Sequence, residues 1–426
     1  MKISRIDKLP AIMASNLAGK EELALKKYRL LESYFHQDSH LAEEMYERRF
    51  QSENTFILPV SIGKHPAFVA LTAEILRLSV SLAREQARLE SLEKQIPCLP
   101  AVMMDSLFQE IEISNEIEGV HSSRKDLEAA WHAEPDTRFA GQLLQYRSLM
   151  KNSQDFPETP EAIRTIYDEM LLCDIEREDP ANRPDGRLFR QGPVYIHDGT
   201  KNIHTGLVPE EKIIEVLEQS LQLVHQEDLP FWVRTAVFHF LFGYVHPFYD
   251  GNGRMNRYLS SLLIEHEWGV LAALQVSLAI RKNKPRYYKA FEKAEKDLNR
   301  GELTDFVHVF MEMMETALQQ EIDNLERQAE KLNAGRNAIA KMDLSKLEKE
   351  LMEVLLSRTL FTVQGATKKE LAELAGCSDG LVRRFVLKYK DRLFVTKDGR
   401  TNCYLLDRQF LEALLKPDPN AAEENG

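Results

Sequence analysis

The pattern of apolar positions along the chain predicts a protein built mainly of helices. Residues 66–95 repeat apolar side chains at helical spacing, which predicts one long helix with the apolar positions Phe68, Leu71, Ile75, Leu76, Val80, Leu82, Leu89 and Leu92. The residues after Pro100 predict a second helix, whose apolar rows contain Leu107, Ile111 and Ile117.

Two strongly apolar stretches flank a polar loop near the middle of the chain. Residues 231–244 are apolar nearly all round, which predicts a helix buried at the centre of its domain. After the loop a second helix is expected to run to Trp268, where Gly269 stops it. The loop reads His246-Pro247-Phe248-Tyr249-Asp250-Gly251-Asn252-Gly253-Arg254-Met255-Asn256-Arg257.

Before the C-terminal region the chain contains one clear strand signal. The β-favouring segment Val194-Tyr195-Ile196-His197 is followed by the turn pair Asp198-Gly199. This combination predicts a small β-hairpin in a fold that is otherwise all-α.

The C-terminal part of the sequence predicts a linker helix and a separate small domain. Residues 343–412 predict two helices, a third helix that Ser378 caps, and a hairpin over residues 393–406, which is the pattern of a winged helix-turn-helix. Residues 413–426 are polar and predict a disordered tail. Residues 304–342 predict a long helix whose heptad spacing serves packing within the chain or in a homodimer, through Leu318, Ile322, Leu325, Ala329 and Leu332.

Charge distinguishes this C-terminal unit from the rest of the chain. Basic residues outnumber acidic ones in residues 343–412, whereas the whole chain has a formal net charge of −12. The predicted third helix would expose Arg383, Arg384, Lys388 and Lys390, which favours contact with DNA. The alternative is a winged helix that binds protein or is purely structural.

Composition limits the class of protein. A hydrophobic content of 43% and a charged content of 29% are typical of a soluble globular chain, and 426 residues allow two or three domains. The acidic balance argues against a protein coated with nucleic acid. No stretch reaches the roughly 20 apolar residues of a membrane span. The scattered cysteines are expected to be reduced core thiols of a cytoplasmic protein, namely Cys98, Cys173, Cys377 and Cys403.

The central loop has the chemistry of a phosphate site. Gly251 and Gly253 precede a buried helix, whose first N–H groups are unpaired and whose dipole favours negative charge. A histidine, a carboxylate and two arginines accompany these glycines. Together they predict a nucleotide site with a general base.

The loop resembles the signature of the Fic (Fic/DOC) family, His-x-Phe-x-Asp/Glu-Gly-Asn-Gly-Arg-x-x-Arg, and all eight fixed positions match. The resemblance implies a helical Fic domain with a β-hairpin over residues 101–303, preceded by an N-terminal helical region over residues 1–100. It also implies roles for the loop residues. His246 would be the catalytic base, Asp250 would hold Mg²⁺, and the phosphates of ATP would contact Gly251, Asn252, Gly253, Arg254 and Arg257. Phe248 is expected to anchor the loop in the core.

In this family AMP passes from ATP to a Ser, Thr or Tyr hydroxyl of a target protein. The Gly-Asn-Gly spacing disfavours the related phosphotransferase branch. By the same resemblance, Val194, Tyr195, Ile196 and His197 form a flap that holds the target segment as an added strand. The pair Tyr287-Tyr288 resembles tyrosines that line the adenine pocket in some members, although Glu295 stands where those members have an asparagine.

An acidic helix segment gains a second interpretation from this resemblance. Ser114 and Glu118 lie four residues apart, so they share one helix face, and in isolation that face is expected to be solvated. The segment from Ser114 to Gly119 resembles the inhibitory motif of the family, Ser/Thr-x-x-x-Glu-Gly/Asn. Glu118 would then pair with Arg257 and keep the γ-phosphate of ATP from that arginine.

The leading hypothesis is therefore a self-inhibited protein adenylyltransferase that acts on another protein or on itself. One alternative is a de-AMPylase on the same fold, in which Glu118 positions water. The other is a DNA-binding regulator whose Fic domain senses nucleotide.

Overall fold

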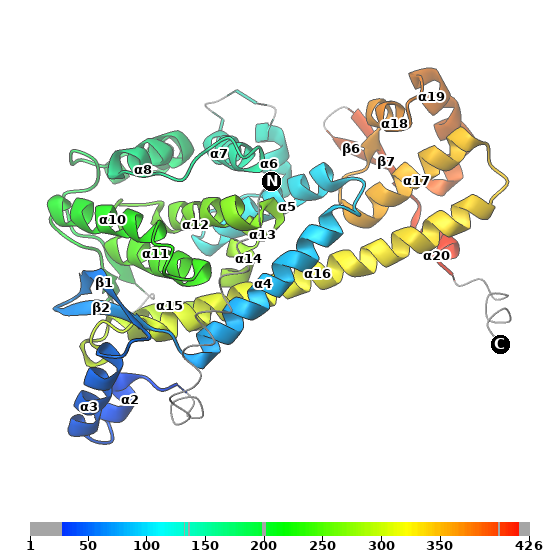
Figure 1. Ribbon diagram of the computed structural model, residues 1–426. Coiled ribbons are helices and arrows are strands. Elements are labelled where there is room, and N and C mark those ends of the chain that lie inside the picture. The colour runs from blue at the N-terminus through cyan, green and yellow to red at the C-terminus, as the bar shows by residue number, and fades with distance from the viewer. Residues whose placement is uncertain (1–27, 132, 135–136, 198–201, 399–400, 417–426) are drawn as a thin grey trace, which may run out of the picture. The chain divides into compact units, whose positions relative to one another are not determined.

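The computed structural model describes residues 28–131, 133–134, 137–197, 202–398 and 401–416. These residues are mostly helical and include three small antiparallel sheets (Figure 1). The chain forms two compact units, each made of three segments. Unit 1 comprises Met1–Ser81, Gly192–Pro247 and Asn283–Glu312, and unit 2 comprises Leu82–Gln191, Phe248–Lys282 and Met313–Gly426.

The buried helix α11 (Phe231–Val245) is the core of unit 1. Its side chains Phe238, Phe240 and Leu241 are fully buried, as the apolar pattern predicts. The other elements of this unit are α2 (Leu31–Phe35), α3 (Ser39–Phe50), β1 (Thr55–Ile62), β2 (His65–Ala70), β3 (Tyr195–His197), β4 (Asn202–Thr205), α10 (Glu210–Val224), α15 (Lys284–Glu295) and a 3-10 turn, η4 (Asp297–Asn299).

The prediction of one helix over residues 66–95 is wrong at its start. Residues His65–Ala70 form β2, which pairs with β1, and α4 (Ala73–Glu93) begins only afterwards. Three consecutive side chains of β2 are buried, so the strand has no alternation that would reveal it. Phe68 also exchanges backbone hydrogen bonds with Gly301 and Leu303, partners that lie far away in the sequence. The hairpin after Val194 is therefore not the first one in the chain.

The helix α12 (Asn252–Trp268) is the core of unit 2 and ends at Gly269, as expected. Gly269 has a φ of 84°, a conformation that glycine adopts without strain. Around α12 the unit contains α5 (Leu99–Ile117), α6 (Arg124–Trp131), α7 (Ala140–Met150), α8 (Pro160–Tyr167), a π-helical turn η2 (Asp168–Leu172), α9 (Cys173–Glu178), η3 (Pro180–Asn182), α13 (Val270–Ala273) and α14 (Val276–Lys282).

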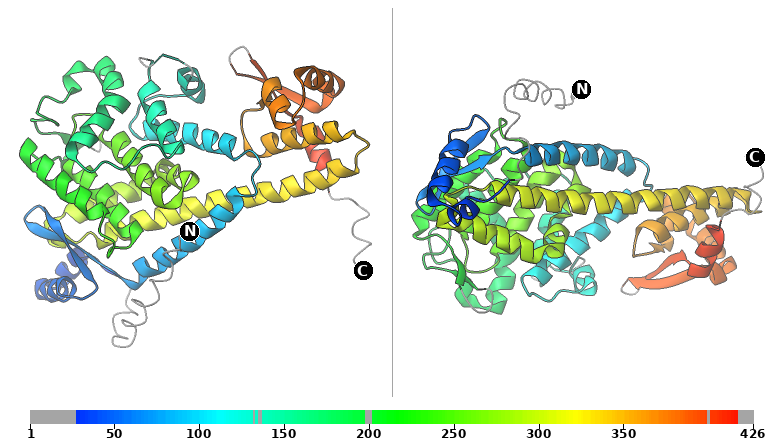
Figure 2. Two further views of the ribbon diagram at one scale, coloured as in Figure 1. Left: turned by 45° about the horizontal axis from the view of Figure 1, so that its top comes forward. Right: turned by 90° about the horizontal axis from the view of Figure 1, so that it is seen from below.

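The predicted linker helix is α16 (Thr304–Lys341). All five positions of its predicted heptad row are buried within the chain, and Leu318, Ile322 and Leu325 are at most 1% exposed. The two views of Figure 2 show α4 and α16 side by side. Arg88 of α4 donates two hydrogen bonds to the carboxylate of Glu326 on α16. The row therefore serves packing within the chain.

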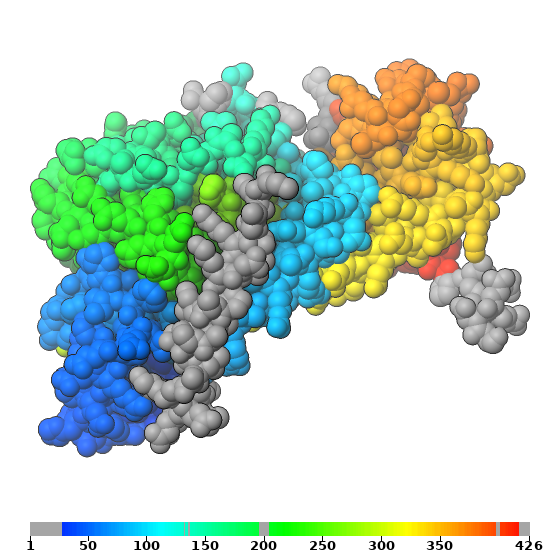
Figure 3. Space-filling view, in the orientation of Figure 1, coloured from blue at the N-terminus to red at the C-terminus, as the bar shows by residue number. Residues whose placement is uncertain are grey.

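The C-terminal elements follow the predicted order of helices and hairpin. They are α17 (Lys346–Phe361), β5 (Ala366–Thr367), α18 (Lys368–Leu374), α19 (Asp379–Lys388), η5 (Lys390–Arg392), β6 (Leu393–Asp398), β7 (Thr401–Leu406) and α20 (Arg408–Leu414). In the space-filling view, α17, α18 and α19 form one continuous body (Figure 3). Capping boxes at Ser345 and Thr367 fix the starts of α17 and α18.

Two C-terminal details differ from expectation. The helix α20 was not predicted, and it extends to Leu414, past the predicted start of the tail at residue 413. Of the four basic residues expected on the third helix and after it, Lys388 is already paired with Glu348, at 2.5 Å. The hairpin turn at residues 399–400 and the tail from residue 417 lie outside the described residues.

None of the four cysteines forms a disulfide, but Cys173 is exposed and Cys377 is partly exposed, so these two are not core thiols. Among the described residues, no helix combines the length and the apolar character needed to cross a membrane.

Candidate functional site

His246 ends α11 in unit 1. It is the C-cap of the helix in the left-handed conformation, with φ 52° and ψ 63°, and its backbone N–H donates to the Phe242 carbonyl. Its ring Nδ1 lies 3.3 Å from the Gly243 carbonyl oxygen. A carbonyl only accepts, so Nδ1 carries the proton and Nε2 presents a lone pair. The backbone therefore fixes the tautomer that a general base at Nε2 needs.

The predicted hairpin is confirmed in the same unit. Strand β3 pairs with β4 in antiparallel register, with Tyr195 opposite Thr205, and the Val194 carbonyl accepts from the Gly206 N–H at 3.0 Å. Tyr195 is 54% exposed, so this side chain is open to a partner. The expected turn at Asp198 and Gly199 lies outside the described residues. The flap role of the hairpin stays a prediction.

The boundary between the two units falls after Pro247, so the rest of the loop belongs to unit 2. Phe248 is fully buried, and its ring stacks on that of Tyr167 with centroids 3.6 Å apart and an interplanar angle of 6°. The Tyr167 hydroxyl donates to the Asp250 carbonyl at 3.2 Å. Phe248 thus anchors the loop in the core, as expected.

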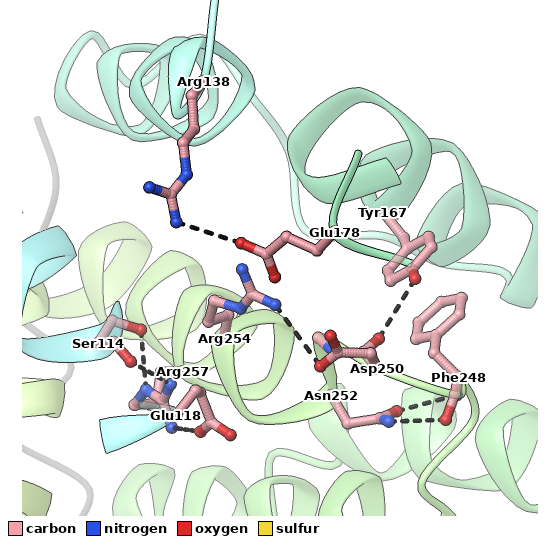
Figure 4. Close-up of polar contacts among 11 residues, drawn as sticks. Ser114, Glu118, Arg138, Tyr167, Glu178, Phe248, Asp250, Asn252, Arg254 and Arg257 are labelled. Atoms are coloured by element: carbon pink, nitrogen blue, oxygen red, sulfur yellow. Dashed lines mark hydrogen bonds and ion pairs between the residues drawn. The ribbon is translucent and has the colours of Figure 1, made fainter. Parts of the chain in front are cut away.

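Asn252 braces this loop from the start of α12. Its side-chain oxygen accepts from the Phe248 N–H at 2.9 Å, and its amide nitrogen donates to the Phe248 carbonyl at 2.7 Å (Figure 4). Both ends of the side chain are used, so Asn252 shapes the loop, and its contact with a phosphate stays a prediction.

Each glycine of the loop has its own physical reason. Gly251 is the N-cap of α12 with φ 81°, and a Cβ there would lie 2.9 Å from the Ile175 side chain. A Cβ on Gly253 would lie 2.0 Å from Glu118 Oε1. The N-cap residue of α12 is a glycine, so no N-cap side chain accepts from the first N–H groups of the helix. These features fit an anion at the helix start.

Arg254 is the residue of the loop whose surroundings best fit a bound anion. Its side chain is 1% exposed, and none of its three guanidinium nitrogens has a hydrogen-bond partner within the described chain. The nearest carboxylate, that of Asp250, lies 3.6 Å from Nη2, beyond hydrogen-bond distance. An unsatisfied buried donor costs about 1–3 kcal/mol, and more for a charged group. A bound phosphate group would remove this cost.

Arg257, one turn later, has its partners within the protein. Its Nη1 donates to Glu118 Oε1 at 2.7 Å, its Nε donates to the Ser114 hydroxyl at 2.9 Å, and its Nη2 donates to the Ser114 carbonyl at 2.8 Å (Figure 4). The arginine side chain is 4% exposed and that of Glu118 is 29% exposed. The predicted contact between Glu118 and Arg257 is therefore present, and the solvated-face interpretation is wrong for Ser114, which is buried.

Asp250 is the candidate metal ligand of the loop. Its side chain is 39% exposed and its Oδ1 accepts from the Gly251 N–H. No group of three or more metal-ligating side chains occurs in the part of the chain that the structure describes. One carboxylate beside an arginine that lacks an anion fits Mg²⁺ held mainly by phosphate oxygens.

The tyrosine pair is placed differently from the loop. The Tyr287 hydroxyl lies 2.8 Å from Nε2 of the buried His239, and its ring packs edge-on against Phe291 in the core of unit 1. Tyr288 is half-buried beside it. Tyr287 thus has a packing role in this structure, and the adenine contact stays a prediction.

Sequence reasoning missed Glu110, which lies one turn before Ser114 on α5. Its carboxylate accepts from the Ser277 N–H at 3.0 Å and from the Ser277 hydroxyl at 2.7 Å, which fixes α5 to the start of α14. Complete burial raises the pKa of Glu110 to about 7, although Ser277 and the positive charge of Arg257 oppose the shift. The four-residue spacing of Glu110, Ser114 and Glu118 is the sequence signal that could have shown it.

Comparison with known proteins agrees with the loop. A family model described as "Fic/DOC family" matches residues 157–264. The structure is similar to that of a Fic family protein from Desulfovibrio desulfuricans G20, with a TM-score of 0.51 and 18% identity over 79% of this chain and 97% of that one. It also matches a fragment of Fic-1 from C. elegans, with a TM-score of 0.41 and 16% identity over 60% of this chain and 74% of that one. Residues 157–264 are therefore a Fic/DOC family domain.

Proposed function

We propose that the chain is a self-inhibited protein adenylyltransferase that transfers AMP from ATP to a hydroxyl of a target protein. The observation that carries this proposal is the buried guanidinium of Arg254, which lacks hydrogen-bond partners at the uncapped start of α12. A phosphate chain satisfies such a group and the helix start together. The complete loop signature of the domain supports the same chemistry.

In the proposed reaction His246 Nε2 removes the proton from the target hydroxyl. The hydroxyl oxygen then forms a bond to the α-phosphorus of ATP, the bond from that phosphorus to the bridging oxygen breaks, and pyrophosphate leaves. Arg254 and the N–H groups at the start of α12 hold the phosphates during this exchange. Mg²⁺ bound by Asp250 and phosphate oxygens would supply further charge neutralisation. Exposed Tyr195 on the hairpin edge is available to a target segment.

The proposed inhibition acts through Arg257. Its Nε, Nη1 and Nη2 each donate to Glu118 or Ser114, so a γ-phosphate could make the same contact with Nη1 only by displacing the Glu118 carboxylate. The glycine at position 253 allows the Glu118 carboxylate to approach the helix start closely. ATP could then bind with its phosphates misaligned for in-line attack.

Transfer of label tests the proposal. Purified protein is incubated with ATP labelled at the α- or the γ-phosphate, together with a cell extract. We expect α-label on protein, more of it with Glu118→Gly and none with His246→Ala. Glu116→Gln is the matched control, because Glu116 is exposed on the same helix and pairs with Arg281 instead. Equal labelling by all variants, or label from the γ-phosphate alone, would overturn the proposal.

A second candidate is removal of AMP from a modified target. It is favoured by the position of the Glu118 carboxylate beside the phosphate loop, where it could orient water. Release of AMP from a pre-modified protein, lost on Glu118→Gly, would identify this reaction. A slower label transfer in the wild-type protein, without release of AMP, would not identify it.

The C-terminal segment is proposed to be a winged helix that binds DNA or recruits the target. Arg383, Arg384 and Lys390 are exposed and in reach of an acidic partner. Salt-sensitive binding of a DNA duplex that is lost on Arg383→Ala with Arg384→Ala would support the DNA role. Such binding in a His246→Ala protein would also support the regulator hypothesis.

A further inference from the structure

The last turn of α11 is completed by donors from the chain around the hairpin. A helix ends with four carbonyls that have no partner inside the helix. In α11 the Phe242 and Gly243 carbonyls face His246, as described above. The Val245 carbonyl accepts from the Leu207 N–H at 3.2 Å, and the Tyr244 carbonyl lies 2.9 Å from His204 Nε2. Residues on and just after β4 therefore close the helix that presents His246.

His204 has an acceptor at each ring nitrogen. Its Nε2 faces the Tyr244 carbonyl, and its Nδ1 lies 2.6 Å from Glu295 Oε2. Both ring nitrogens of His204 therefore face oxygen atoms that can accept a hydrogen bond. The side chain is 8% exposed, so these contacts are shielded from water.

The catalytic histidine lies next to this pair. The ring centroids of His204 and His246 are 6.2 Å apart. The pair is therefore placed to hold the end of α11 and the ring of His246 in position. Burial raises the pKa of the neighbouring Tyr244 phenol, which keeps it neutral.

We propose that His204 and Glu295 form a positioning pair that ties the hairpin to the end of α11 and sets the orientation of His246. The proposal rests on the proposed function, because it concerns the base of that reaction. The three residues come from β4, α15 and the C-cap of α11, which the chain brings together only in the folded state.

The test uses the full chain with Glu118→Gly as the parent, to which His204→Ala, His204→Gln or Glu295→Gln is added. For His204→Ala we expect a transfer rate about 10- to 100-fold lower, which is less than the usual contribution of the base itself, about 100- to 10,000-fold, with the KM for ATP nearly unchanged. Hydrogen exchange at the Leu207 amide should become faster. Glutamine at 204 can still donate to the Tyr244 carbonyl, so it should restore slow exchange. Glu295→Gln should lower the transfer rate less than His204→Ala does, because its side-chain oxygen can still accept from His204 Nδ1.

The matched control is His225→Ala, which removes an exposed histidine at the C-cap of α10 and should match the parent. The proposed positioning pair would be overturned if both rates in His204→Ala, the transfer rate and the Leu207 exchange rate, stay within about twofold of those of the parent. If the parent transfers no label, the proposed function fails, but the exchange measurement still tests the positioning pair. Faster exchange in His204→Ala with rescue by His204→Gln supports the pair. Unchanged exchange overturns it.

Discussion

The end of α11 and the start of α12 lie close together in sequence but are finished in different ways. At the end of α11 each of the last four carbonyls faces a donor from the protein itself. At the start of α12 there is no side-chain cap, and the buried Arg254 has no hydrogen-bond partner. The protein thus supplies hydrogen-bond donors to the end of α11, where the proposed base His246 lies. At the start of α12, where the proposed phosphate site lies, the guanidinium of Arg254 has no acceptor among the described residues.

Arg254 and Arg257 sharpen this difference within one helix. Both are buried, but only Arg257 has acceptors, and these come from α5 of the same chain. A carboxylate that is hydrogen-bonded to Arg257, with the more distant Asp250 carboxylate near Arg254, is the arrangement expected of a site that can take up part of a ligand while another part is excluded.

The largest effect is expected from His246→Asn. Asparagine tolerates the left-handed conformation at this position, so folding should be retained. Transfer should fall by at least about 100-fold, because the group that accepts the proton is gone, whereas the affinity for ATP should stay within about twofold. The two quantities are measured by label transfer and by calorimetric titration. A comparable loss of ATP affinity would mean that the end of α11 also binds nucleotide.

Arg254→Met should change binding and stability in opposite directions. Losing charge-assisted hydrogen bonds to phosphate should weaken ATP binding by about 10- to 100-fold, equivalent to about 1.4–2.7 kcal/mol. Without nucleotide, the free energy of unfolding should rise by about 1–3 kcal/mol, since buried guanidinium donors without hydrogen-bond acceptors are removed. Urea unfolding with and without ATP measures both.

The control for this variant is Arg281→Met, which removes an arginine that pairs with Glu116 at the surface. It should leave ATP affinity unchanged. Lower stability of Arg254→Met in the absence of nucleotide would show that Arg254 has a partner of its own in the free protein.

The effect of Glu110→Gln should be seen in the pH dependence of stability. The unfolded carboxyl has a pKa near 4.5 and the folded one a pKa of about 7, so folding is favoured below pH 4.5 and this contribution is lost as the pH rises to 7. The difference of about 2.5 pH units corresponds to about 3 kcal/mol. Between pH 5 and pH 8 the variant should therefore lose less stability than the wild type in urea unfolding. Parallel curves for the two proteins would contradict the burial of an ionisable group at this position.

The sequence predicted the features that local pattern controls. The apolar run of α11, the stop at Gly269 and the loop signature are each contained in a short stretch, and the contact between Glu118 and Arg257 followed from a resemblance that links two motifs. The strand β2 was missed because its burial depends on partners near Gly301. Three further features depend on three-dimensional contacts that the sequence spacing does not record. They are the hydrogen bonds of Asn252 to the loop, the lack of hydrogen-bond partners of Arg254 in the described chain and the pair of His204 with Glu295.

The central claim is that Glu118 keeps a phosphate from Arg257, and comparing ADP with a non-hydrolysable ATP analogue tests it most directly. Calorimetric titration of wild-type protein should give similar Kd values for the two ligands, because the arginine that would hold the γ-phosphate is occupied by Glu118. In Glu118→Gly the ATP analogue should bind at least about tenfold more tightly than ADP, as expected for one charge-assisted contact of about 1.5–3 kcal/mol. The same ratio of Kd values in both proteins would contradict the account.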